Sequence, residues 1–179
     1  MQNPFTLTFG KSPLEPVERP LPTMEIVDTF TAETVNQQMF IITGVRGSGK
    51  TVMMTEIARR LREREDWVVI ELNPATDLLQ GMLAKLNSNK VCAAIIKSAK
   101  IDLSFFGFGV AIEGVPPLTD TETAIITILE KLKKQDKRLL ITIDEVTNND
   151  YMKVFAGSFQ IFVRQDLPVF LLATGLYEN

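Results

Sequence analysis

The chain has 179 residues, 45% of them hydrophobic, and a formal net charge of −3, which suits one α/β domain with a sizeable core and argues against nucleic-acid binding by bulk charge alone. A single cysteine and no histidine exclude an intramolecular disulfide, a multi-cysteine metal cluster and imidazole catalysis. No uninterrupted apolar run reaches about 18 residues and residues 1–22 are polar and rich in proline, so we predict no membrane span and no signal peptide, and expect a cytoplasmic location.

The beginning of the chain has the composition of a linker. Residues 1–23 contain five prolines and are predicted to form an irregular arm that precedes a core domain over residues 24–179. Within the arm, Phe5–Phe9 alternates between apolar residues and threonine, which fits a short strand or a hydrophobic clasp. Residues 24–30 are expected to form a helical turn that leads into the first strand of the core.

The next segment combines a strand, a glycine-rich loop and a helix. The apolar, β-branched run Met39–Thr43 predicts a buried strand, and Val52–Arg64 carries apolar residues at helical spacing. The loop between them fills the phosphate-binding pattern G-x-x-x-x-G-K-[ST] with Gly44, Val45, Arg46, Gly47, Ser48, Gly49, Lys50 and Thr51. The glycines let backbone N–H groups turn toward an anion, at which the following helix aims its positive end. We therefore predict that Lys50 contacts the β- and γ-phosphates of a nucleotide and that Thr51 binds Mg²⁺. A glycine-rich turn without a nucleotide is the alternative, which this context disfavours.

The rest of the chain alternates between strand-like and helical patterns. Strands are predicted at Trp67–Leu72, Leu139–Ile143 and Val169–Ala173, and helices at about 77–86, 91–99, 119–132 and 149–165. Asp77 and a capping box formed by Thr119 and Glu122 mark two of the helix starts. Residues 101–113 alternate on both sides of Gly107, which predicts a β-hairpin. The fold class is therefore α/β, a P-loop NTPase three-layer α/β/α sandwich with a mainly parallel sheet and a β-hairpin insertion.

Two acidic residues, Asp144 and Glu145, directly follow the strand Leu139–Ile143. Because ligands of parallel sheets bind beyond the carboxyl ends of the strands, we expect the pair to lie opposite the phosphate loop, on a strand that neighbours the one before the loop. Asp144 would orient Mg²⁺, and Glu145 would act as the general base for the water that attacks the γ-phosphate. An acidic pair at a strand end is by itself more often a solvated turn, but its combination with Lys50 and Thr51 favours a metal site. A carboxylate at the γ-phosphate also favours hydrolysis over transfer to a small molecule.

Other positions have two interpretations each. Asn73 ends a strand, where its amide could restrain Glu145 or could simply form a turn. Thr174 ends the last strand, where it could reach the γ-phosphate or the attacking water, or could have no such role. Arg46 could touch the γ-phosphate or a neighbouring subunit, although a solvated loop residue is favoured. The basic run Arg59–Arg64 is read as a solvated helix end in preference to a DNA contact.

These motifs carry a family resemblance. The loop Gly44–Thr51, the run Ile143–Glu145 and the polar Thr174 resemble the AAA+ branch of P-loop NTPases. Together with Asn3–Phe5 and Phe9–Gly10, they are similar to a prokaryotic group near the origin-recognition initiators.

The resemblance implies roles for individual residues and further parts of the protein. It makes Thr174 the sensor 1 residue, where relatives usually have asparagine, and Asn73 the switch that restrains Glu145. It also implies that the chain is only the nucleotide-binding core, because such proteins continue past this strand with a fifth strand, an arginine finger, a lid with sensor 2 and often a DNA-binding domain. The sheet edge beside Phe40–Ile42 would then be unpaired, with Phe5–Phe9 as a candidate cover.

The functional expectation is an AAA+-type ATPase core that binds ATP or ADP with Mg²⁺ and hydrolyses ATP slowly in isolation. Its catalytic residues would be Glu145, Lys50 and Thr174. Expected partners are the nucleotide, another protein or further copies of the chain, and DNA through a C-terminal domain that the sequence lacks; a membrane is not expected. The alternative is a nucleotide-gated module that recruits DNA or protein with little hydrolysis of its own. A small-molecule kinase would need a cluster of lid arginines that the sequence does not show.

Overall fold

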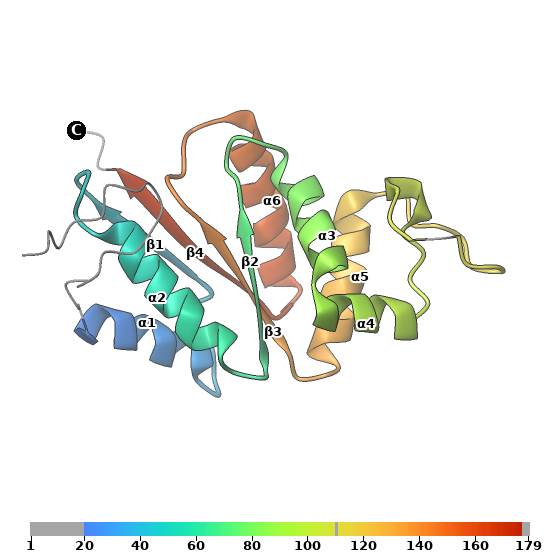
Figure 1. Ribbon diagram of the computed structural model, residues 1–179, viewed down its shortest axis with the longest axis horizontal. Coiled ribbons are helices and arrows are strands. Elements are labelled where there is room, and N and C mark those ends of the chain that lie inside the picture. Colours follow the sequence, from blue (N-terminus) through green and yellow to red (C-terminus); the bar gives the residue numbers. More distant parts are fainter. Residues whose placement is uncertain (1–19, 110, 177–179) are drawn as a thin grey trace, which may run out of the picture.

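The computed structural model describes residues 20–109 and 111–176, in which helices separate successive strands along the chain (Figure 1). In chain order these elements are α1 (Pro20–Thr31), β1 (Met39–Gly44), α2 (Lys50–Arg62), β2 (Trp67–Leu72), α3 (Leu78–Ser88), α4 (Lys90–Ser98), the 3₁₀ turn η1 (Ser104–Phe106), α5 (Thr121–Lys133), β3 (Arg138–Ile143), α6 (Asp150–Arg164) and β4 (Val169–Leu176). No helix within these two ranges combines the length and the apolar character that crossing a membrane requires. Apart from the hairpin expected at 101–113, the predicted strands and helices of the core are present, with small shifts at their ends.

The four strands form one sheet in the order β1-β4-β3-β2, and every pair is parallel. β4 thus lies between β1 and β3, and the expectation that the strand before the phosphate loop neighbours the strand before the acidic pair is wrong. The burial of the strands agrees with this order. β4 is buried along Val169–Gly175, as a strand covered on both faces must be, whereas β1 alternates between exposed and half-buried residues.

Helices cover both faces of the sheet (Figure 1). α1 and α2 lie on one face, where their apolar residues form a small core with Trp67, Leu140, Phe170 and Leu172. α3, α5 and α6 lie on the other face over a larger core, and α4 packs outside α3 and α5. The predicted three-layer α/β/α sandwich is therefore confirmed. The lone Cys92 belongs to the larger core, and burial raises the pKa of its thiol to about 12, as for a structural cysteine rather than a nucleophile.

The edge strand β1 is more exposed than its sequence suggests. Phe40 and Ile42 pack against the core under α1 and α2, but Met39 and Ile41 on the opposite face are 44% and 51% exposed. The prediction of a buried strand is wrong for that face, because in the described part of the chain β1 pairs with β4 alone. The segment Phe5–Phe9, a candidate cover for this edge, lies outside the described residues.

The N-terminal helix α1 starts earlier than expected. It begins at Pro20, a residue suited to a first helical position, so residues 20–23, which were assigned to the irregular arm, are helical; the earlier part of the arm lies outside the described residues. The Arg138 side chain closes the other end of α1 by donating from Nη1 to the Phe30 carbonyl over 2.6 Å. Its guanidinium also lies 5.9 Å from the ring centres of Trp67 and Phe170, an arrangement that permits cation–π attraction.

Side-chain caps begin several helices. Asp77 caps α3 by accepting from the Gln80 N–H over 3.0 Å, as predicted. α5 is capped by Asp120, which accepts from the Thr123 N–H over 2.7 Å. The predicted capping box on Thr119 is therefore wrong by one position, because α5 begins one residue later than the pattern suggested.

No β-hairpin occurs in the described residues of 101–113, so this part of the predicted fold class is wrong; Val110 lies outside the described residues. The reason is a carboxylate that competes for the backbone. Asp102 is 2% exposed, and its side chain accepts from the N–H groups of Ser104 and Ile112 over 2.9 and 2.8 Å, while its backbone carbonyl accepts from Leu118. Of the alternating apolar residues, Ile101, Leu103 and Phe108 pack on the larger core, as does Phe106 outside the pattern, whereas Phe105 is 62% exposed.

Asp102 makes the stability of this loop depend on pH. Hydrogen bonds from Ser104 and from the Ile112 N–H lower its pKa below the ordinary 3.8, so its contribution is complete above that value and is lost as the pH falls through the lowered pKa. We expect Asp102→Asn to lower the unfolding temperature at pH 7, and the difference from the wild type to shrink below pH 3.8. Thermal unfolding from pH 7 to pH 3 measures it, with Asp136→Asn as an exposed control. A difference that does not change with pH would contradict this role.

Candidate nucleotide-binding site

The loop between β1 and α2 needs glycine at several positions. Gly47 and Gly49 have φ angles of +79° and +82°, in the left-handed region that side chains disfavour. A Cβ on Gly44 would stand 2.9 Å from the Ser48 hydroxyl oxygen. α2 starts at Lys50 without a side-chain cap, whereas α3, α4, α5 and α6 each have one. The first N–H groups of α2 are thus left for an external acceptor, the arrangement that binds phosphate at helix starts.

Lys50 folds back into the loop. Its side chain is buried, and its Nζ donates to the carbonyls of Gly44 and Val45 over 3.0 and 2.9 Å. An ammonium group has three N–H donors, and the two carbonyls hold it at the mouth of the loop. The charge therefore sits where an anion bound to the loop would meet it.

The Asp144 carboxylate joins three elements of the fold. It accepts from the Thr51 hydroxyl, with its two oxygens 3.2 and 3.0 Å from Oγ1, and from the buried Thr174 hydroxyl. The Thr174 hydroxyl also accepts from the Glu145 N–H over 2.8 Å, and the Thr174 carbonyl accepts from Val146. The structure thus brings Thr51, Asp144 and Thr174 together even though β1 and β3 are not neighbours, because β4 supplies Thr174 between them.

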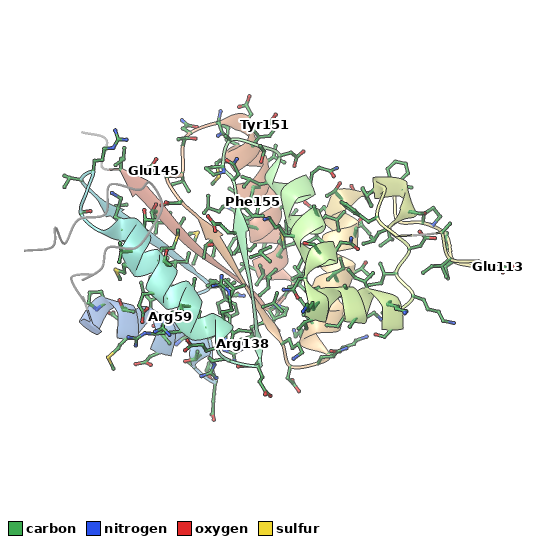
Figure 2. All side chains as sticks on the ribbon, in the orientation of Figure 1. Arg59, Glu113, Arg138, Glu145, Tyr151 and Phe155 are labelled. Carbon is green, nitrogen blue, oxygen red and sulfur yellow. The ribbon has the colours of Figure 1, made fainter. Side chains whose placement is uncertain are left out.

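Glu145 lies at the edge of the same pocket. Its φ is +51°, a left-handed conformation that is uncommon for a non-glycine residue and indicates a constrained turn. Figure 2 shows Glu145 at the end of the sheet beside the start of α2. A cavity of about 260 Å³ is lined by Glu145 and the loop residues Arg46–Val52. A larger hollow of about 500 Å³ on α4 has no predicted site residue in its lining.

Asn73 forms the turn after β2. Its side-chain carbonyl accepts from the Ala75 N–H over 2.9 Å, and its backbone carbonyl accepts from Thr76. No hydrogen bond joins Asn73 to Glu145 in the described residues. Of the two interpretations of Asn73, the structure shows the turn.

Sequence reasoning missed one residue that joins this turn to the loop between β3 and α6. We call this loop, residues 144–149, the acidic loop. The Asn149 side chain donates to the Pro74 carbonyl over 2.8 Å. Its only sequence signal was its place in front of the helix α6, where asparagine is a common cap.

The oxygen atoms at the site fit a magnesium ion that arrives with a nucleotide. Among the described residues, no group of three carboxylate or cysteine side chains could hold a metal by itself. Mg²⁺, however, usually binds one or two protein oxygens and takes its other ligands from phosphates and water. The Thr51 hydroxyl and the Asp144 carboxylate, already within hydrogen-bond distance of each other, are such a pair.

The parallel sheet, the glycine loop ahead of α2 and the acids after β3 define a protein of the P-loop NTPase class. Residues 27–163 match the family described as an ATPase domain predominantly from Archaea, and the chain belongs to this family. The resemblance to an AAA+ ATPase core is thereby confirmed at the level of family and fold. No curated protein matches the chain.

The solved structure of Cdc6p has the same fold. Cdc6p from Pyrobaculum aerophilum is 15% identical with a TM-score of 0.52, over 93% of this chain and 42% of that one. The Aeropyrum pernix ORC1 protein in complex with DNA is 16% identical with a TM-score of 0.49, over 89% and 39%. PCH-2 from C. elegans is 16% identical with a TM-score of 0.46, over 89% and 37%. The chain therefore spans about two fifths of the length of Cdc6p.

Proposed function

We propose that the chain from the start of α1 onward is the nucleotide-binding core of an Mg²⁺-dependent ATPase, with the residues before α1 as an N-terminal arm. The observation that carries the proposal is the convergence of Lys50, Thr51, Asp144 and Thr174 on the uncapped start of α2. A backbone site for phosphate, a cation and a pair of Mg²⁺-binding oxygens are the parts that phosphoryl transfer requires.

Each part of the site has a separate task. The backbone of Gly44–Gly49 and the Lys50 ammonium would hold the phosphates, and Lys50 would exchange its loop carbonyls for phosphate oxygens. Thr51 and Asp144 would hold Mg²⁺, which neutralises phosphate charge when bound. In this arrangement Arg46 also borders the phosphates, since it lines the same cavity.

Glu145 would be the general base. Its carboxylate is exposed at the pocket, where it can accept a proton from a water molecule. The Thr174 hydroxyl donates a hydrogen bond to Asp144 and accepts one from the Glu145 N–H, so it would position both acids. In the turn after β2, the side-chain oxygen of Asn73 accepts from the Ala75 N–H. The proposed restraint of Glu145 would use the NH₂ group of the same Asn73 side chain.

Hydrolysis is proposed to be slow without a partner. The cavity lining includes one arginine, Arg46, which belongs to the phosphate loop itself. An arginine supplied by another molecule is worth about 10³–10⁵ in rate for this chemistry. We therefore propose that another protein, or a second copy of the chain, completes the site. Contact with DNA stays a prediction.

Phosphate release from ATP tests the proposed function. We expect saturable release on the order of 10⁻³ s⁻¹ or slower that requires Mg²⁺ and stops with a chelator. ATP binding without any release would favour the nucleotide-gated module instead. Absence of ATP binding would contradict both.

A further inference from the structure

Two loops beyond the carboxyl ends of β2 and β3 are joined by one side chain, and they lie together at the top of the view in Figure 1. Nδ2 of Asn149 donates to the Pro74 carbonyl over 2.8 Å and to the Thr147 hydroxyl over 3.0 Å. Oδ1 of the same amide accepts from the Met152 N–H over 2.8 Å and caps α6. Asn149 therefore serves its own helix and also fixes a turn that lies 75 residues away in sequence.

The acidic loop is consequently fixed at both of its ends. At its start, Thr174 accepts from the N–H groups of Glu145 and Val146. At its end, Asn149 binds the backbone of the β2 turn. Glu145 lies at the first of these anchors in a left-handed conformation, and the second anchor follows four residues later, at Asn149.

We propose that Asn149 is a positioning residue, whose bond to the Pro74 carbonyl holds the acidic loop against the Asn73 turn and so keeps Glu145 at the phosphate-loop pocket. This inference rests on the proposed function, since it concerns the same general base. It makes Asn149 act through Glu145 and not on the substrate.

Capping alone does not account for the contact. A helix cap needs only the side-chain oxygen, which serine or aspartate supplies as well. Asn89 is such a cap, since its Oδ1 accepts from the N–H groups of Val91 and Cys92 at the start of α4. At position 149 the amide NH₂ group makes the additional bond to another loop.

The matched pair Asn149→Ser and Asn89→Ser separates the two roles, because both variants keep a capping oxygen. We expect Asn149→Ser to lower kcat by about 10- to 100-fold, since a displacement of about 1 Å at a reacting group can cost this much. The KM for ATP should change by no more than about twofold, because the phosphate loop is untouched. Asn89→Ser should leave kcat as in the wild type.

Amide hydrogen exchange without nucleotide gives a second measurement. The N–H groups of Thr76 and Val146 are hydrogen-bonded in the two loops that the Asn149–Pro74 hydrogen bond joins. Their exchange should accelerate in Asn149→Ser but not in Asn89→Ser. Asn149→Asp should act like Asn149→Ser, because it keeps the cap and places a carboxylate oxygen against the Pro74 carbonyl.

The inference is overturned if exchange at Thr76 and Val146 is unchanged in Asn149→Ser, or if both serine variants have the wild-type kcat. A wild type that does not hydrolyse ATP would refute the proposed function, whereas the exchange measurement would still decide whether Asn149 holds the two loops together.

Discussion

Replacing Lys50 with alanine is expected to weaken ATP binding by about 100-fold, a loss of about 2.7 kcal/mol. The expected size is that of a charge-assisted hydrogen bond removed from a buried site. Titration calorimetry of the variant with ATP and Mg²⁺ measures the loss. Binding within about twofold of the wild type would contradict the assignment of the site.

The control for this variant is Lys85→Ala, which removes an exposed lysine from the last turn of α3. It should leave ATP binding unchanged. Because Lys50 also donates to two loop carbonyls, the thermal unfolding of the variant must be measured as well. A variant that unfolds at the wild-type temperature but binds ATP more weakly would show that the substitution affects the binding site and not the fold.

The second large effect is expected for Glu145→Gln, which should keep ATP binding and lower kcat by about 10²–10⁴-fold. The amide has almost the shape of the carboxylate but cannot take a proton from water. The hydrogen bond to Thr174 comes from the backbone N–H of residue 145, so the substitution leaves it in place. Single-turnover phosphate release, together with ATP titration, separates chemistry from binding.

Glu113→Gln is the matched control, since Figure 2 shows Glu113 at the far end of the molecule from Glu145. Its rate should equal that of the wild type. If Glu145→Gln hydrolyses ATP as fast as the wild type, the assigned base is wrong.

The elements that could be predicted from the sequence are those encoded by local pattern. The loop Gly44–Thr51 needs particular residue types at fixed spacing, and β3 is recognised by its mostly apolar, β-branched residues. The proximity of Thr51 and Asp144 followed from the rule that strand ends gather at one edge of a sheet. These inferences used properties that each segment carries by itself.

The errors concern properties that depend on other segments. The exposure of Met39 and Ile41 depends on which strands flank β1, and the order of the strands is a property of the whole sheet. The alternating pattern in 101–113 resembles a hairpin until the Asp102 carboxylate takes the N–H groups that a second strand would need. Asn149 and Pro74 are far apart in sequence, and no local pattern reveals their contact.

The most direct test of the account is the crystal structure of the protein with Mg²⁺ and an ATP analogue that resists hydrolysis. We expect Nζ of Lys50 to leave the carbonyls of Gly44 and Val45 and to contact the β- and γ-phosphates, with the metal between Thr51 and Asp144. A triphosphate bound elsewhere, for example in the hollow on α4, with Lys50 still on its loop carbonyls, would contradict it.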